Sequence, residues 1–206
     1  MKLYLSSFRL GDRTEDLKKM NPTNGKVGIL VNALDNQSSQ TRKKIFDRER
    51  EDMLSLGFEV AELDLREYFG RERDLQKRIL DFDMIWSSGG NAFVLNLAMK
   101  LSGFRSAAIN SLSAGNLVYA GYSAGAVVAG KSLKGIELVD KVDDFPRDYP
   151  NSEIVWGGLG FVDVSIVPHY ESNHPESPLI RKTVDYLNQA KMPFRALRDG
   201  EVLIVS

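Results

Sequence analysis

The stretch at residues 116–130 constrains the fold of this chain more than any other part of the sequence. It reads NLVYAGYSAGAVVAG: a short apolar run of strand character, a Gly-x-Ser-x-Gly turn centred on Ser123, and a second run of small apolar residues. The pattern predicts a strand, a sharp turn and a helix. A residue at such a corner is pushed towards strained backbone angles, and glycines on either side keep bulk away from the neighbouring backbone. The corner would place the hydroxyl at a helix N-terminus, where free N–H groups stabilise a developing oxyanion.

We therefore interpret Ser123 as a nucleophile. The alternative is that the small residues only let a buried helix pack closely on its sheet, because Gly-x-Ser-x-Gly is common in proteins. The apolar run before the turn favours the catalytic interpretation, since that is the context in which this serine turn works.

Residues 125–132 also match the phosphate-loop pattern G-x-x-x-x-G-K-[ST]. A phosphate loop needs a helix that begins at its Lys-Ser pair. Here the sequence LKGI follows at once and breaks such a helix, so we do not expect nucleotide binding.

Strand and helix patterns alternate along most of the chain. Apolar runs predict strands at residues 2–6, 27–31, 58–63, 84–86, 117–120 and 161–167. Helical patterns lie between and after them, at residues 14–20, 38–56, 71–80, 92–101, 105–113 and 176–191. This rhythm predicts an α/β fold, a three-layer sandwich in which helices cover both faces of a mostly parallel sheet. Asp199-Gly200 lies between two further apolar runs and predicts a hairpin there.

Three notable segments follow predicted strands, at the sheet edge where active sites of parallel sheets collect. They are the GGN sequence at residues 89–91, Ser123 and His169. The chain has only two histidines, and His174 lies in a polar loop. A lone histidine is more often a hydrogen-bonded structural residue than a catalytic one. The place of His169 at the end of a strand nevertheless favours it as the general base opposite the serine.

A serine–histidine pair needs a carboxylate that fixes the imidazole tautomer. Asp199 follows a terminal strand, but Asp-Gly is also an ordinary turn pair. Glu171 is the second candidate, because it lies two residues beyond His169 and would share its strand face if the strand continued that far. The residues alone leave both open.

The glycine pair at residues 89–90 precedes a predicted helix. Glycine lets a backbone come close to a ligand, so the N–H of Gly90 is a candidate oxyanion donor. Asn91 is a candidate for a hydrogen bond to substrate. Paired glycines also form ordinary strand-to-helix turns, so this segment carries little weight by itself.

The length, net charge and residue counts of the chain exclude several classes of function. A length of 206 residues fits one domain, residues 1–206. A formal net charge of −1 does not indicate the excess of basic residues that is typical of nucleic-acid-binding proteins. The absence of cysteine excludes disulfides and thiolate sites, and two histidines leave few metal ligands, so we expect neither a metal nor another cofactor. No segment resembles a signal peptide or a membrane span, which favours a soluble cytoplasmic protein without a membrane partner.

The GYSAG sequence at residues 121–125, the GGN sequence and the PHY sequence at residues 168–170 together resemble the peptidase E family of serine peptidases. The resemblance covers most of the chain in order, including a final acid-Gly segment. It implies the architecture of the class I glutamine amidotransferases, with serine in place of their cysteine. The order nucleophile, histidine, acid also differs from that of the α/β-hydrolases.

This resemblance implies roles for individual residues. Ser123 would be the nucleophile, His169 the base, and Asp199 the acid, at a place where the family has glutamate. The backbone N–H groups of Gly90 and Ala124 would form the oxyanion hole. Family members cleave small peptides that begin with aspartate, or related aspartyl bonds such as those in cyanophycin. Three cations are candidates to pair with a substrate carboxylate: Arg105, Lys141 and Arg147.

The main hypothesis is a serine peptidase whose partner is a small peptide substrate, with Asp-X dipeptides as candidates. One alternative is a catalytically silent member of the same fold that binds a ligand or a protein. Another is a hydrolase of aspartyl bonds similar to cyanophycinase. Amide transfer from glutamine is not expected, because its usual nucleophile is cysteine. The oligomeric state stays open, a homodimer included.

Overall fold

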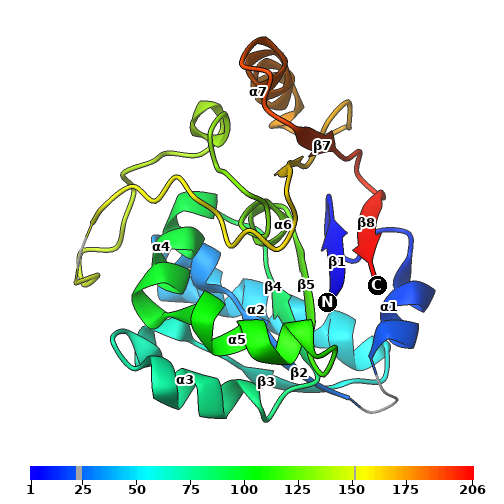
Figure 1. The fold of residues 1–206 in the computed structure, drawn as a ribbon, viewed down its shortest axis with the longest axis vertical. Coiled ribbons are helices and arrows are strands. Elements are labelled where there is room, and N and C mark those ends of the chain that lie inside the picture. The colour runs from blue at the N-terminus through cyan, green and yellow to red at the C-terminus, as the bar shows by residue number, and fades with distance from the viewer. Residues whose placement is uncertain (22–24, 151) are drawn as a thin grey trace.

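A six-stranded sheet forms the centre of the computed structural model, which describes residues 1–21, 25–150 and 152–206 (Figure 1). The strand order is β3-β2-β4-β5-β1-β8. These strands are β1 (Lys2–Ser6), β2 (Lys26–Leu30), β3 (Glu59–Glu62), β4 (Met84–Ser87), β5 (Val118–Tyr122) and β8 (Val202–Val205). The first five run parallel to one another, and β8 runs antiparallel to β1. The predicted α/β fold with a mostly parallel sheet is confirmed.

Helices cover both faces of this sheet, as Figure 1 shows. On one face lie α1 (Thr14–Met20) and α2 (Ser39–Ser55); on the other lie α3 (Glu72–Ile79), α4 (Ala92–Ser102) and α5 (Phe104–Ser113). Neighbouring strand residues point to opposite faces, so Trp86 packs with the first group and Ile85 with the second. Burial on both faces explains why the central strands β2, β4 and β5 are mostly apolar, while β3 and β8 at the two sheet edges are partly exposed. Among the described helices, none has the length and apolar character that crossing a bilayer takes.

The predicted serine turn is present between β5 and the single-turn helix α6 (Ala124–Val127). Ser123 has φ 48° and ψ −117°, a conformation that residues with a side chain rarely adopt. The end of β4 packs against this corner. A Cβ on Gly125 would overlap the carbonyl oxygen of Ser87, and one on Gly121 would lie 2.7 Å from it. After α6, the next helical turn of this fully described segment starts at Ile136, so the helix that a phosphate loop requires is missing.

The predicted hairpin around Asp199-Gly200 is wrong. β7 (Phe194–Ala196) instead pairs in parallel with β6 (Ser165–Val167) in a separate two-stranded sheet, while β8 pairs with β1. The Asp-Gly turn therefore connects two sheets. In Figure 1 the small sheet and α7 (Ser177–Gln189) lie beyond the carboxyl end of β1. His169 follows β6 and Asp199 follows β7, and both bond to Ser7, so the small sheet brings them to that edge.

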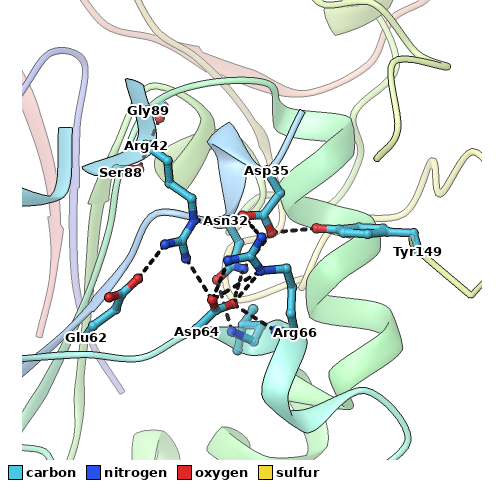
Figure 2. Close-up of polar contacts among 10 residues, drawn as sticks. Asn32, Asp35, Arg42, Glu62, Asp64, Arg66, Ser88, Gly89 and Tyr149 are labelled. Carbon is cyan, nitrogen blue, oxygen red and sulfur yellow. Dashed lines mark hydrogen bonds and ion pairs between the residues drawn. The ribbon is translucent and has the colours of Figure 1, made fainter. Parts of the chain in front are cut away.

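A buried charged network fixes the loop that borders the same edge. Figure 2 shows Tyr149 pointing at Asp35. The Tyr149 hydroxyl donates to Asp35 Oδ2, and the two oxygens are 2.7 Å apart. Arg42 of α2 forms ion pairs with Asp35, with Glu62 and with Asp64, near the ends of β2 and β3. Tyr149 is thereby tied to the segments that follow β2 and β3.

Candidate active site

Ser123 lies in the wall of a cavity of about 400 Å³ at the carboxyl edge of the sheet. Its backbone N–H is shared between the carbonyl oxygens of Ser6 and Ser7, at 3.3 and 3.2 Å. Its hydroxyl does not cap α6 and forms no hydrogen bond with the described residues. The strained corner thus presents a hydroxyl that the fold itself does not use.

The glycine turn after β4 lies directly beside this serine. A Cβ on Gly89 would be 3.2 Å from the Cβ of Ser123. Gly90 has φ 141°, and a Cβ there would be 2.5 Å from the carbonyl oxygen of Ala33, so only glycine fits. Within the described part of the chain, the N–H groups of Gly90 and Ala124 donate no hydrogen bond. Two free donors therefore flank Ser123, which is what an oxyanion hole requires.

Asn91 has a structural task in this turn. Its Oδ1 accepts the N–H groups of Phe93 and Val94, at 2.9 and 3.1 Å, and so caps α4. Its Nδ2 donates to the carbonyl oxygen of Lys141 at 2.8 Å. The side chain ties the glycine turn at residues 89–90 to the loop that contains Lys141, and its contact with substrate stays a prediction.

His169 and Asp199 meet in the way expected of a base and its orienting acid. The His169 side chain is 2% exposed, and its Nδ1 lies 2.7 Å from Asp199 Oδ1. His169 and Ser123 line the same cavity. The structure has no hydrogen bond between these two described side chains; in substrate-free enzymes such bonds are often long and tighten when substrate binds.

Glu171 does not occupy the place that its spacing predicts. β6 ends at Val167, before His169, so no strand carries Glu171 onto the same face as the imidazole. Glu171 is exposed and forms an ion pair with Arg198. Of the two candidate acids, the structure brings only Asp199 to His169.

The surroundings of His169 favour its neutral form. Burial lowers the pKa of its imidazole, the charge of His174 acts in the same direction, and Asp199 opposes them. The net shift is downward, so at neutral pH the imidazole is unprotonated and able to accept the proton of a serine hydroxyl.

The structure also brings together a group of side chains that are potential metal ligands. The ligand atoms of His169, His174 and Glu176 lie within 4.8 Å of one another. The two imidazole rings are stacked at 8° to each other, so the lone pairs in their planes run parallel and do not converge on one ion. This arrangement does not suit a tetrahedral metal centre.

Two cations line the cavity. Lys141 is one of the three that the sequence suggests; Arg105 lines a different cavity and binds the carbonyl oxygen of Leu159, and Arg147 lines neither. Sequence reasoning missed Arg48 of α2. Its Nε and Nη2 donate to the buried carboxylate of Glu49, which leaves Nη1 without a partner among the described residues.

Sequence reasoning also missed Asp140. Its Oδ2 accepts the N–H of Ala92, the first residue of α4, at 2.7 Å. Burial, with a contribution from Glu176, raises the pKa of Asp140 to about 7. Asp140, Asp144 and Glu176 all line the cavity and bring three carboxyl groups to it. The only signal for Asp140 in the sequence is its place in an irregular, charged loop.

Comparisons with known proteins show the family to which the chain is similar. The sequence model of peptidase family S51 matches residues 35–206. An uncharacterized peptidase of Pasteurella multocida is 26% identical over 162 residues, and a protein of Streptomyces coelicolor named peptidase E is 31% identical over 133 residues. A crystal structure from Listeria monocytogenes, of a protein assigned as peptidase E, superimposes with a TM-score of 0.77 at 24% identity. The superposition covers 99% of this chain and 93% of the Listeria chain, and it supports the predicted fold.

The matched segments differ in how much of each relative they span. They make up 78% of this chain and 72% of the Pasteurella protein, and 62% of this chain but only 51% of the Streptomyces protein. The chain thus spans between about half and three quarters of the length of these relatives. The family match nevertheless covers most of the chain. The chain belongs to peptidase family S51, and its class is that of the serine-type peptidases.

Proposed function

We propose that this protein hydrolyses short peptides through Ser123, His169 and Asp199. The observation that carries the proposal is a free serine hydroxyl at a strained corner, in one cavity with a buried imidazole whose Nδ1 contacts a carboxylate. Nucleophile, base and orienting acid are the three parts that acyl transfer by serine needs.

The reaction has two halves. Ser123 Oγ attacks the peptide carbonyl carbon, and His169 takes the hydroxyl proton. The N–H groups of Gly90 and Ala124 stabilise the negative oxygen of the tetrahedral intermediate. The C–N bond then breaks, and His169 returns the proton to the departing amine. Water attacks the acyl-serine ester with His169 again as base, which releases the acid product and restores the serine hydroxyl.

The charges of the cavity support dipeptides of the Asp-X type as substrates. Such a dipeptide carries two carboxylates and one ammonium group. The cavity lining has two cations, Arg48 and Lys141, and three carboxyl groups, those of Asp140, Asp144 and Glu176. A volume of about 400 Å³ is in the range of small-molecule sites and suits a dipeptide better than a long chain.

A panel of dipeptides tests this function, with Ser123→Ala as the matched control. We expect turnover of Asp-X dipeptides by the wild type and a loss on the order of 10³-fold or more in Ser123→Ala. A fluorophosphonate should label the wild type and not the variant. Equal turnover by both proteins would refute the role of Ser123. An unlabelled wild type without turnover would instead indicate a silent binding protein, and cleavage confined to other aspartyl bonds would indicate a cyanophycinase-like hydrolase.

A further inference from the structure

Ser7, the residue that follows β1, contacts all three members of the proposed triad. Its carbonyl oxygen accepts the N–H of Ser123 at 3.2 Å, a bond shared with the carbonyl of Ser6. Its hydroxyl accepts the backbone N–H of His169 at 2.8 Å and donates to Asp199 Oδ1 at 2.9 Å. These partners come from three segments far apart in the sequence, and Ser7 is fully buried where they meet.

We propose that Ser7 is the positioning residue of this site, and that its hydroxyl sets the distance between His169 and Asp199. The proposal rests on the proposed function insofar as that function makes these two residues the base and the acid. Ser7 does not line the cavity, so it acts on the reaction only through its neighbours.

The chemistry of a hydroxyl group supports this assignment. A serine hydroxyl has one proton to donate and lone pairs to accept with. The backbone N–H of His169 donates to the hydroxyl oxygen. Two acceptors lie near the proton: Asp199 Oδ1 at 2.9 Å and the carbonyl oxygen of Leu197 at 3.2 Å. The carboxylate is nearer and, being charged, forms the stronger bond. Ser7 therefore links the backbone of the base to the side chain of the acid.

The same carboxylate oxygen is held from two directions. Asp199 Oδ1 contacts both Ser7 Oγ and His169 Nδ1, so the hydroxyl restricts rotation of the carboxyl group that orients the imidazole. The backbone of His169 has φ 60°, which costs energy for a residue with a side chain. The bond from its N–H to Ser7 helps to hold that conformation.

Removal of the hydroxyl would loosen both links. In Ser7→Ala the buried N–H of His169 loses its acceptor, and Asp199 loses one of its two donors. Because a misplacement of about 1 Å can cost on the order of 100-fold in rate, we expect kcat to fall roughly 10- to 100-fold with KM changed little. Ser7→Thr keeps the hydroxyl and should restore most of the rate.

A double-mutant cycle separates positioning from general damage to the fold. If Ser7 acts through Asp199, Ser7→Ala should slow the wild type but have little further effect on Asp199→Ala. Ser102→Ala is the matched control: Ser102 is also a buried serine, but its hydroxyl bonds only to the carbonyl oxygen of Met99 in α4. Urea unfolding of each variant shows whether it is folded. Effects of Ser7→Ala that are equal in both backgrounds would overturn the proposal.

Proton NMR provides a readout that does not depend on turnover. The His169 Nδ1–H proton should give a downfield resonance that Asp199→Ala abolishes. Ser7→Ala should shift or broaden this resonance, and Ser102→Ala should leave it in place. If the wild type cleaves no peptide but Ser7→Ala still alters the resonance, the proposed function fails and the positioning role stands. An unchanged resonance in folded Ser7→Ala would overturn the positioning role whatever the activity.

Discussion

The imidazole rings of His169 and His174 stack face to face, with centroids 3.7 Å apart and planes 8° apart. Phe8 lies against both rings, with centroid distances of 6.0 and 5.7 Å. The charged groups that act on His169 are Asp199 and Glu176, which raise its pKa, and His174, which lowers it. Burial is the largest influence and also lowers it, so His169 stays neutral to a lower pH than a free histidine.

This stack predicts the pH dependence of the reaction. The acid limb of kcat/KM should lie below the ordinary histidine pKa of about 6.5. His174→Asn exposes His169 and removes a like charge; both changes raise the pKa of His169, so the limb should move to higher pH. His174→Phe keeps a ring over His169 and removes only the charge, so its shift should be smaller. A limb that does not move in His174→Asn would contradict this account.

A comparison of Asp199→Asn with Glu171→Gln tests the assignment of the acid. Asparagine at position 199 still contacts Nδ1 but favours the wrong imidazole tautomer, so kcat should fall on the order of 10³- to 10⁴-fold. Glu171 contacts Arg198 at the surface, and its variant should keep the wild-type rate within about twofold. Steady-state kinetics on one dipeptide decides between them, and a larger loss in Glu171→Gln would reverse the assignment.

The fold was predictable wherever a local pattern determines the structure. The glycines that mark the sharp turn at Ser123 lie within the turn itself, and they are needed because the end of β4 leaves no room for side chains at Gly121 and Gly125. The hairpin at Asp199-Gly200 failed for the opposite reason. Asp-Gly correctly indicates a turn, but which strands pair depends on distant partners, and here β7 and β8 join different sheets.

The site was predictable in its reactive groups but not in the residues around them. Ser123 and His169 follow strands, and the carboxyl ends of parallel strands meet at one edge. Ser7 also follows a strand, so the same rule could have indicated it. Arg48 could not be found in this way, because it lies within a long charged helix and only the fold shows which of that helix's arginines face the cavity.

Arg48 predicts a preference for acidic substrates. Glu49 holds one edge of its guanidinium group, and the remaining Nη1 is available to a substrate carboxylate. Arg48→Gln should raise KM roughly tenfold or more for Asp-X dipeptides and much less for Ala-X dipeptides. Arg105→Gln is the control, because Arg105 lines another cavity. Equal effects of Arg48→Gln on both substrate series would show that Arg48 does not bind the acidic side chain of the substrate.

Close packing at the serine turn predicts a large cost for one added methyl group. In Gly125→Ala the new Cβ would overlap the carbonyl oxygen of Ser87, a backbone atom that cannot move without displacing β4. We expect a loss of about 1–3 kcal/mol in the free energy of unfolding, together with most of the activity. Gly157→Ala places a Cβ where no atom lies within 4 Å, so urea unfolding should show it near wild type.

Asp140 predicts opposite effects on stability and on substrate binding. Its pKa of about 7, above the ordinary value of 3.8, means that the folded protein holds this proton more tightly than the unfolded chain. The resulting stability is complete below about pH 4 and is lost as the pH rises towards 7. Asn at this position stays neutral and can still accept the N–H of Ala92. Asp140→Asn should therefore be more stable than wild type at pH 8, by on the order of 2–4 kcal/mol, and nearly equal near pH 4.

If Asp140 binds the substrate ammonium, the same variant should have a raised KM. Urea unfolding at both pH values and dipeptide kinetics at pH 8 check the two effects, and a stability difference independent of pH would show that the Asp140 proton is not its source.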